Sequence, residues 1–507
     1  MTDQDRKHVV MFSAEAAPFV KVGGLADVAG ALPKMLERLG MRVTIVMPDY
    51  QVIPHEKFGV QPSASVPSFE MPMGPKAVRV EVAQAIMPGT GVEVFFLGGG
   101  GYFARAGVYD DPVTRKAYVD NMQRFTFLAK GGLEFLRRLG RPADVIHCHD
   151  SQTGLVPGLL RTVYRDDPFF AGSGCLFTIH NLAYQGLFEA ETMAWAGIDK
   201  SHFYPSSPFE YWGKVNFMKI GIELADLVNT VSETYAREIQ SGPEFGYGLE
   251  GVLKDRAGDL FGIVNGIDYD EWNPETDRLI PAQYSSGDLS GKALCKAVLL
   301  QTMGLPQRRG RIPLMGIISR LADQKGFDLI DEAIERIAEQ DMQMVVLGTG
   351  QQKYHELFQG MSARYPDKIA VKLGFDNRLA HLIEAGSDLF LMPSKYEPCG
   401  LNQLYSLRYG SVPIVRATGG LADTIADYNI GADSGTGFVF QEYSSGAMMT
   451  AIERALVVFS DSERWQRLMA RDMLQRWSWE ESARKYVELY GRICRREARQ
   501  DRHGTCV

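Results

Sequence analysis

Two copies of one pentapeptide, GGLAD, mark the first residues that could carry chemistry. One copy lies at 23–27 in KVGGLAD and the other at 419–423 in RATGGLAD, almost the whole chain apart. Glycines let a ligand approach the backbone closely, and amide groups at the start of a helix can bind an anion. We therefore predict that Lys21, Gly23 and Gly24 face a ligand, although a loop lysine is otherwise a solvated charge. The amides that could hold phosphate at the second copy are those of Thr418, Gly419, Gly420 and Leu421.

Two positive side chains and one carboxylate follow later apolar runs. Arg320 ends PLMGIISR, Lys325 lies shortly after it, and Glu397 follows DLFLMPS. Paired cations suit a diphosphate, because neutralising it favours both its binding and its departure as a leaving group. A carboxylate here can hydrogen-bond sugar hydroxyls or stabilise positive charge that develops on a sugar ring. The alternatives are surface charges partnered by Asp323 and, for Glu397, a helix N-terminal carboxylate worth about 0.3–1 kcal/mol.

Histidines cluster in HCHDSQTG and FTIHNLAYQG. In a strand, His147 and His149 share one face while Cys148 takes the other. A closed zinc site needs four ligands and no further set is evident, so we expect no metal here. His180, which ends its own apolar run, is the better functional candidate. The alternative for His180 is a buried histidine whose hydrogen bonds are satisfied.

Short apolar runs alternate with amphipathic stretches along the whole chain, which is typical of parallel α/β units. The alternation pauses in a stretch rich in turn formers near 265–290 and then restarts. We predict an N-terminal Rossmann-like domain over 1–265 and a C-terminal one over 266–476. Residues 477–507 should form a helix that returns to the N-terminal domain. The expected strands are 8–15, 41–48, 92–98, 144–150, 175–181, 226–232, 261–266, 313–320, 342–348, 369–374, 388–394 and 412–416, with helices at 25–40, 326–340 and 421–428.

Composition excludes several classes of protein. The 507 residues carry a net charge of −8, which argues against a broad nucleic-acid or anionic-membrane surface. Six cysteines without a CxxC pair favour a reducing compartment. The charged N-terminus runs straight into an apolar strand without a signal peptide pattern, and no apolar run is long enough to cross a bilayer. We expect a cytoplasmic protein with no nucleic-acid or membrane partner.

Taken together, the motifs resemble those of bacterial glycogen synthase and plant starch synthase. The resemblance rests on KVGGLADV, FTIHNLAYQGLF, VNGIDYDEWNP, SRLADQKGFDLI and PSKYEPCGLNQLYSLRYGSVPIVRATGGLADTI, in that order and spacing. It implies a GT-B glycosyltransferase, in which two Rossmann-like doubly wound domains face a central cleft. The implied reaction transfers glucose from ADP-glucose to the non-reducing end of an α-1,4-glucan such as glycogen, with retention at the anomeric carbon. No metal or other cofactor is implied.

The resemblance also assigns roles to residues. Lys21, His180, Arg320, Lys325 and Glu397 are implied to be catalytic, with the two later cations on the diphosphate and Glu397 on the glucosyl group. Further contacts to the nucleotide sugar are implied for Gly23, Gly24, Asp150, Thr418, Gly419, Gly420 and Leu421. Asn181 and Tyr184 are implied on the acceptor side. A same-face substitution and a covalent intermediate both remain open as routes to retention.

Departures from the family pattern keep other functions open. Ser151 stands where many members have tryptophan, so an aromatic platform for the glucan is expected to be missing. Tyr405 replaces the second glutamate of many related transferases, although glycogen synthases share the tyrosine. The alternatives are a transferase that uses UDP-glucose or a small acceptor, and a non-catalytic glucan-binding protein. A dinucleotide-dependent oxidoreductase is a further alternative, weakened because no complete GxGxxG follows a strand with an acid at the required distance.

Overall fold

The computed structural model describes residues 6–503, with side chains described through Arg495, and the chain divides into two compact units. The N-terminal unit comprises the described residues up to Val231, then Ala236–Ile263, and the chain from Trp479 onward. The C-terminal unit comprises Ser232–Tyr235 and Val264–Ser478. The main divisions therefore fall after Ile263 and Ser478, against the expected 265 and 476. The first five residues and Cys506 lie outside the described part.

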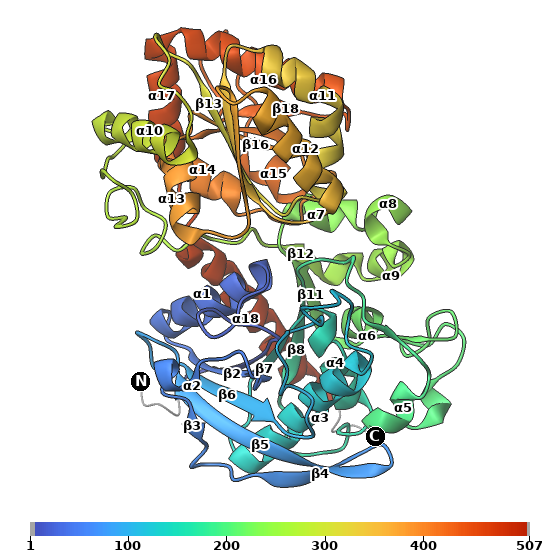
Figure 1. The fold of residues 1–507 in the computed structure, drawn as a ribbon. Helices are drawn as coiled ribbons and strands as arrows, with labels where there is room; N and C mark the ends of the chain where they lie inside the picture. The colour runs from blue at the N-terminus through green and yellow to red at the C-terminus, as the bar shows by residue number, and fades with distance from the viewer. Residues whose placement is uncertain (1–5, 504–507) are drawn as a thin grey trace. The chain divides into compact units, whose positions relative to one another are not determined.

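The N-terminal unit is built on one sheet with strand order β12-β11-β8-β7-β1-β2-β6-β5-β3, in which β4 pairs with β5 (Figure 1). The strands from β12 to β6 in this order are parallel and almost fully buried, because helices cover both faces of such sheets. These strands are β1 (His8–Phe12), β2 (Arg42–Pro48), β6 (Glu93–Gly98), β7 (Val145–His149), β8 (Gly174–Ile179), β11 (Leu227–Thr230) and β12 (Leu260–Gly262).

An antiparallel extension of this sheet was missed by the sequence analysis. Strand β5 (Lys76–Ile86) runs antiparallel to β6, and it also pairs with β3 (Gln61–Pro62) and β4 (Phe69–Met73). Its sequence, KAVRVEVAQAI, places buried and exposed residues in near alternation. This period of two is the pattern of a strand with one face in water, so the signal was present in the sequence.

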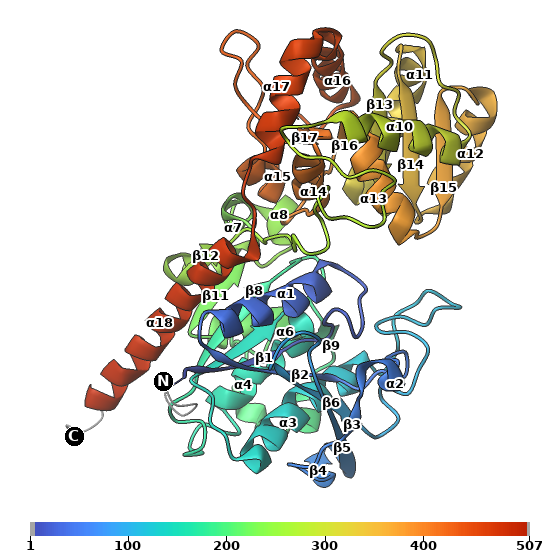
Figure 2. The same cartoon turned by 90° about the vertical axis from the view of Figure 1, so that its left-hand side faces the viewer.

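The long C-terminal helix α18 (Trp479–His503) belongs to the N-terminal unit and contacts its sheet through tyrosine hydroxyls. In α18, the hydroxyl of Tyr490 lies 2.9 Å from Nδ1 of His147, and Tyr486 accepts a 3.1 Å hydrogen bond from Asn229. Figure 2 shows α18 as the long red helix. The helices are α1 (Gly24–Arg38), α2 (His55–Phe58), α3 (Asn121–Leu139), α4 (Leu155–Arg161), α5 (Thr192–Ala196), α6 (Phe217–Leu224), α8 (Pro243–Gly246), α9 (Glu250–Asp255) and α18 (Trp479–His503). Helix α7 (Glu233–Glu238) spans a junction between the units.

The C-terminal unit is a parallel, doubly wound sheet with strand order β15-β14-β13-β16-β17-β18. Successive residues of β13 face opposite cores: Met315 and Ile317 belong to one cluster and Leu314 to the other. The strands are β13 (Leu314–Ile318), β14 (Gln343–Gly348), β15 (Ile369–Leu373), β16 (Leu389–Met392), β17 (Val412–Arg416) and β18 (Phe438–Phe440). The helices are α10 (Ser290–Met303), α11 (Phe327–Glu339), α12 (Gln352–Arg364), α13 (Asn377–Gly386), α14 (Asn402–Tyr409), α15 (Gly419–Thr424), α16 (Ser445–Ser460) and α17 (Ser462–Met473).

Each sheet has a switch point where its strand order reverses direction. In the C-terminal unit, β13 pairs with β14 on one side and β16 on the other. In the N-terminal unit, β1 lies between β2 and β7 in the same way. Ligands of open α/β sheets bind beyond the carboxyl ends of the strands at this point. The loops after β1, β7, β13 and β16 are therefore where each unit should carry its site.

Candidate active site

The switch point of the C-terminal unit brings together two predicted residues that are far apart in sequence. Lys325 ends a short 3-10 turn (Asp323–Lys325) after β13, and Glu397 follows β16. The Nζ atom of Lys325 donates to Oε2 of Glu397 at 2.6 Å, and Oγ of Ser394 donates to the same oxygen at 3.0 Å. Glu397 is 5% exposed. The carboxylate is thus buried, oriented by two donors and paired with a cation.

Arg320 lies in the same loop and donates a hydrogen bond within it. Its guanidinium donates to Oε1 of Gln324 at 2.6 Å, and the side chain is exposed. Asp323, the surface partner considered for these cations, forms an ion pair with Lys353 at 2.7 Å and accepts from Tyr354. Lys325 therefore belongs to the Glu397 site in this structure, not to a surface pair with Asp323.

The second GGLAD motif packs tightly against the Glu397 loop. Helix α15 begins at Gly419, earlier than the expected helix at 421–428. A Cβ atom on Gly420 would lie 2.0 Å from the carbonyl oxygen of Cys399, and one on Gly419 would lie 2.0 Å from that of Glu397. Gly419 also has a φ of 44°. These glycines are therefore required by the close approach of two backbone segments.

Three of the four backbone amides that we expected to be bare donors at this motif already form hydrogen bonds within the protein. Thr418 N donates to Arg416 O at 2.9 Å, and Leu421 N donates to Thr418 O at 3.0 Å. Gly420 N donates to Glu397 O at 3.1 Å. The donors are used internally because α15 is packed against the Glu397 loop and starts two residues earlier than expected.

In the N-terminal unit, the buried carboxylate of Glu15 organises the first GGLAD loop. Its Oε2 accepts from Val22 N at 2.5 Å and Gly23 N at 3.0 Å, while Tyr109 OH donates to Oε1 at 2.7 Å. Burial raises the pKa of Glu15 against the opposite effect of these donors. The strand expected at 8–15 included Glu15, so the residue was not predicted as functional, although a carboxylate directly after a buried strand was the available signal.

Lys21, Gly23 and Gly24 lie on the outside of this loop. A Cβ atom on Gly23 or Gly24 would meet nothing within 4 Å, in contrast to the second motif. The Nζ atom of Lys21 donates to Oδ1 of Asp27 at 2.6 Å, and the lysine side chain is 54% exposed. The two pentapeptides therefore share a sequence while their glycines meet different surroundings.

Asp150 follows β7 in a strained backbone conformation. Its φ is 56°, which is uncommon for a residue other than glycine. Its Oδ1 accepts from His180 N at 2.7 Å and more weakly from Asn181 N at 3.4 Å. Burial raises the pKa of Asp150 to about 7. The carboxyl group thus ties the end of β7 to the segment that carries His180.

The histidines form a buried, neutral group. Nδ1 of His149 lies 3.0 Å from Nε2 of His180, and the rings of His147 and His149 are 4.0 Å apart, so these two share a strand face as predicted. Burial lowers the pKa of His180 to about 3 and those of His147 and His149 well below the usual value. His180 can therefore exchange hydrogen bonds with a ligand at neutral pH without carrying a charge. Among the side chains that the structure describes, residues 6–495, no group has the composition and placement of a metal site.

Residues considered for the acceptor lie around the end of β8. Tyr184 is 52% exposed, and Oδ1 of the half-buried Asn181 accepts from Ala183 N at 3.1 Å. Ser151 is buried, and a Cβ atom on Gly186 would lie 3.2 Å from its Cβ. Position 151 thus faces the protein interior here.

Tyr405, which replaces a glutamate of many related transferases, lies in the C-terminal unit and is also buried. Its ring stacks on Trp272 with ring centroids 3.9 Å apart.

Phe375 is a further candidate that the sequence analysis missed. It lies two residues after the end of β15, at the same edge of the sheet as Glu397, and its side chain is 88% exposed. An aromatic ring left in water at a ligand-binding edge is suited to stack on a planar ligand group. The signal was an aromatic residue directly after a predicted strand.

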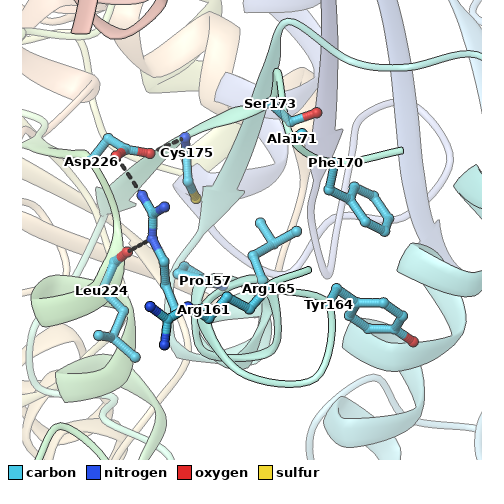
Figure 3. A pocket seen from close by; sticks show the side chains of 11 residues that line it. Pro157, Arg161, Tyr164, Arg165, Phe170, Ala171, Ser173, Cys175, Leu224 and Asp226 are labelled. Atoms are coloured by element: carbon cyan, nitrogen blue, oxygen red, sulfur yellow. Dashed lines mark hydrogen bonds and ion pairs between the residues drawn. The ribbon is translucent and has the colours of Figure 1, made fainter. Parts of the chain in front are cut away.

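A cavity of about 110 Å³ lies elsewhere in the N-terminal unit (Figure 3). Cys175 and Asp226, which line it, stand at the amino ends of β8 and β11, the edge opposite to His180. Arg161 pairs with Asp226, which also accepts from Cys175 N at 2.7 Å. The cavity is thus distinct from the candidate active site.

The raised pKa of Asp150 predicts a pH-dependent stability. The folded state holds this proton up to about pH 7, whereas the unfolded chain releases it near pH 4, so the ionisation destabilises the fold as pH rises between these values. We expect wild type to lose about 2–3 kcal/mol relative to Asp150→Asn between pH 5 and pH 8. Asparagine keeps the acceptor oxygen, and any constant difference in stability between the two proteins cancels when their pH profiles are compared. Urea denaturation of both proteins measures this difference, and parallel pH profiles would contradict it.

Family models match most of both units. The starch synthase catalytic domain matches residues 8–255, and glycosyl transferases group 1 match residues 307–467. No helix within residues 6–503 combines the length and the apolar composition that a bilayer span requires.

Bacterial relatives align over almost the full chain. Glycogen synthase of Syntrophotalea carbinolica is 46% identical over 95% of this chain and 98% of its own length. That of Koribacter versatilis is 45% identical over 95% and 97%. Glycogen synthase of Thermosipho africanus is 43% identical over 96% and 98%.

Solved structures show the same fold. The catalytic domain of starch synthase IV from Arabidopsis thaliana, bound to ADP and acarbose, is 35% identical, with a TM-score of 0.87 over 96% of this chain and 99% of that one. Sucrose-phosphate synthase from Thermosynechococcus elongatus is 17% identical, with a TM-score of 0.57 over 96% and 99%, and shares the fold alone.

Proposed function

This chain belongs to the bacterial glycogen synthase family, and from that premise we propose that it transfers glucose from ADP-glucose to the non-reducing end of an α-1,4-glucan, with retention of the anomeric configuration. It is a glycosyltransferase with the GT-B fold. The observation that carries the proposal is the Lys325–Glu397 pair at a switch point. The starch synthase relative that binds ADP supports an adenine nucleotide as the nucleotide part of the sugar donor.

The C-terminal unit is proposed to hold the nucleotide sugar. Lys325 and Arg320 bind the diphosphate and stabilise the charge that develops on it as the glucosyl bond breaks. Glu397 orients Lys325 in the free enzyme and contacts the glucosyl group in the complex. The start of α15 contributes its dipole near the phosphates, through Gly419 and its neighbours. Because these cations act where a metal ion would otherwise stabilise the leaving group, we propose that transfer needs no metal.

The N-terminal unit carries its own set of proposed ligand contacts. The KVGGLAD loop offers Lys21 and the open backbone at Gly23 and Gly24 to the nucleotide sugar. Neutral His180 exchanges a hydrogen bond with a glucose hydroxyl, and Asp150 holds the backbone of His180 in place. Asn181 and Tyr184 contact the acceptor. The helix α18 supports this site by docking on His147.

Phe375 is proposed to stack on the adenine base of the donor. Its ring is exposed at the edge of the C-terminal sheet where the nucleotide is expected. Stacking of a base on an aromatic ring is worth about 1–3 kcal/mol. We expect Phe375→Ala to raise KM for ADP-glucose by about tenfold, with a small effect on kcat, because the contact is present equally in the ground and transition states. Initial rates over a range of ADP-glucose concentrations measure this, and an unchanged KM would refute the contact.

Labelled glucose incorporation into glycogen tests the proposed function. Purified protein is incubated with glycogen and ADP-glucose or UDP-glucose, each with and without a metal chelator. We expect incorporation from ADP-glucose that the chelator does not reduce. Preference for UDP-glucose would favour the alternative donor. Glycogen binding without any incorporation would favour a non-catalytic glucan-binding protein.

A further inference from the structure

The segment 269–277, YDEWNPETD, belongs to the C-terminal unit and contains neither a helix nor a strand. The side chain of Trp272 is nevertheless half-buried, and that of Asp277 is buried. Connecting segments normally run over the surface and leave their side chains in water. Buried side chains on such a segment indicate a packing partner, and here the main partner is α14.

Trp272 lies between two helices. Its ring stacks on Tyr405 of α14 with centroids 3.9 Å apart and on His381 of α13 with centroids 3.8 Å apart. The interplanar angles are 11° and 10°. Stacked aromatic pairs add to the stabilisation that burial alone provides. The tryptophan therefore holds α14 against α13 at a fixed separation.

Hydrogen bonds extend this contact along α14. Nη2 of Arg408 donates to Oδ1 of Asn273 at 2.7 Å, and the hydroxyl of Tyr409 donates to Oδ2 of Asp277 at 2.6 Å. Tyr405, Arg408 and Tyr409 are three and four positions apart, so they lie on one face of the helix. Each of them contacts the segment 269–277. We call the contacting residues of that segment, Trp272, Asn273 and Asp277, the α14 clamp.

The clamp is fixed where the main segment of the C-terminal unit begins and ends. That segment runs from Val264 to Ser478. Near its two ends, Ile267 N donates to Trp477 O at 2.8 Å, and Trp477 N donates to the hydroxyl of Tyr269 at 2.8 Å. The clamp is thus part of a bonded framework, which makes it a firm support for a helix.

The first turn of α14 holds the loops that carry the candidate catalytic residues. Nδ2 of Asn402 donates to Ile318 O at 2.7 Å, at the end of β13. Nε2 of the buried Gln403 donates to Cys399 O at 2.9 Å, in the loop that begins with Glu397. The position of α14 therefore affects both the loop after β13 and the loop after β16.

The position of α14 depends on what packs against it. The helix has eight residues, and the side chain of Leu401 does not cap its N-terminus. Isolated helices of this length are not stable in water, so tertiary contacts decide where the first turn lies. Catalytic groups must be held to within a fraction of an ångström, and a shift of about 1 Å can lower a rate by about 100-fold. A contact on one face of α14 can therefore affect the reaction without touching a substrate.

We propose that the α14 clamp positions the catalytic loops for glucosyl transfer, with Trp272 holding α14 so that Lys325 and Glu397 keep their productive geometry. Trp272 is a positioning residue, which acts through Tyr405 and the first turn of α14. The proposal rests on the proposed function for the roles of Lys325 and Glu397. Support of the fold alone is the alternative, and it predicts a loss of Tm without a loss of kcat in the folded protein.

Kinetics of Trp272→Leu and Trp272→Phe give the first test. Leucine removes the stack, so we expect kcat of the folded protein to fall about tenfold, with KM for ADP-glucose within about threefold of wild type. Misplaced groups affect the transition state more than the ground state. Phenylalanine retains an aromatic ring, and Trp272→Phe should keep at least about half of kcat. Asn273→Ala removes one hydrogen bond with little loss of packing, so it keeps the test open if Trp272→Leu does not fold, and it should lower kcat about threefold.

Ile452→Ala is the matched control for stability. Ile452 is buried in α16, in the core cluster on the other face of the sheet from Leu314. Its truncation should lower Tm by about 5–10 °C, comparable to the loss in Trp272→Leu. We expect kcat of Ile452→Ala to equal that of wild type below the unfolding transition. An equal loss of kcat in Ile452→Ala and Trp272→Leu would overturn the proposal.

Hydrogen–deuterium exchange of the full-length protein provides a measurement that needs no substrate. Peptides that cover 318–326 and 395–405 should exchange faster in Trp272→Leu than in Ile452→Ala, because the clamp supports these loops. Equal exchange in the two variants would overturn the proposal, as would faster exchange with an unchanged kcat. If wild type transferred no glucose while these peptides still exchanged faster in Trp272→Leu, the support of the loops would be upheld and the proposed function rejected. Normal transfer by wild type with an unchanged kcat in Trp272→Leu would reject the clamp alone.

Discussion

Lys325→Ala is expected to lower kcat by about 10²–10³, with a smaller effect on KM for ADP-glucose. Lys325 is the cation placed 2.6 Å from the buried Glu397, at the switch point where the diphosphate is proposed to bind. Charge on the diphosphate grows as the glucosyl bond breaks, so a fixed cation stabilises the transition state more than the ground state. Steady-state kinetics with ADP-glucose and glycogen measure the effect, and near-normal turnover would reject the role.

The Lys325→Ala variant needs a control for folding, because removing the lysine side chain leaves the buried carboxylate of Glu397 without its cation. Breaking such a pair is destabilising when the remaining charge stays buried. We therefore expect Tm to fall in Lys325→Ala and to recover partly in Lys325→Ala/Glu397→Gln, while kcat stays low in both. Arg308→Ala is a matched surface control, because its ion pair with Asp341 is exposed and should contribute little.

Gly420→Ala is expected to cost both stability and activity. A Cβ atom at this position would lie 2.0 Å from the carbonyl oxygen and 2.5 Å from Cα of Cys399, both in backbone that cannot rotate away. The loop 397–399 must therefore move, and Gly420 N would lose its 3.1 Å hydrogen bond to Glu397 O. Overpacking of this kind costs about 1–3 kcal/mol. Because Glu397 moves with the loop, we also expect kcat to fall by about tenfold or more.

Gly24→Ala is the matched stability control, since Gly24 occupies the same place in the first GGLAD motif. Nothing lies within 4 Å of a Cβ atom there, and alanine is the better helix former at the start of α1. We expect its Tm to equal or exceed that of wild type. Thermal unfolding of the two variants side by side checks the contrast, and equal losses of Tm would show that the second motif is not packed as described.

Much of the fold could be predicted from local sequence. Each expected strand corresponds to an observed strand at nearly the same place, because a run such as MRVTIVMP is apolar enough to be buried on both faces. Ends were less accurate: the strand expected at 8–15 stops at Phe12. Because of that error, Glu15 was not recognised as a residue that organises a loop. Its hydrogen bonds to Val22, Gly23 and Tyr109 depend on the tertiary structure and cannot be predicted from the residues next to it in sequence.

The sequence by itself determined the alternation of strands and helices, and it placed Arg320, Lys325, Glu397 and His180 at or just after strand ends. Only the tertiary structure decided which of those ends meet. Lys325 reaches Glu397 because β13 pairs with β16, and Asp150 reaches His180 because β7 pairs with β8. It also decided that the glycines of one GGLAD are packed and those of the other open. The physical reason is that periodicity is a property of neighbouring residues, whereas strand order and packing depend on pairings between segments far apart in the chain.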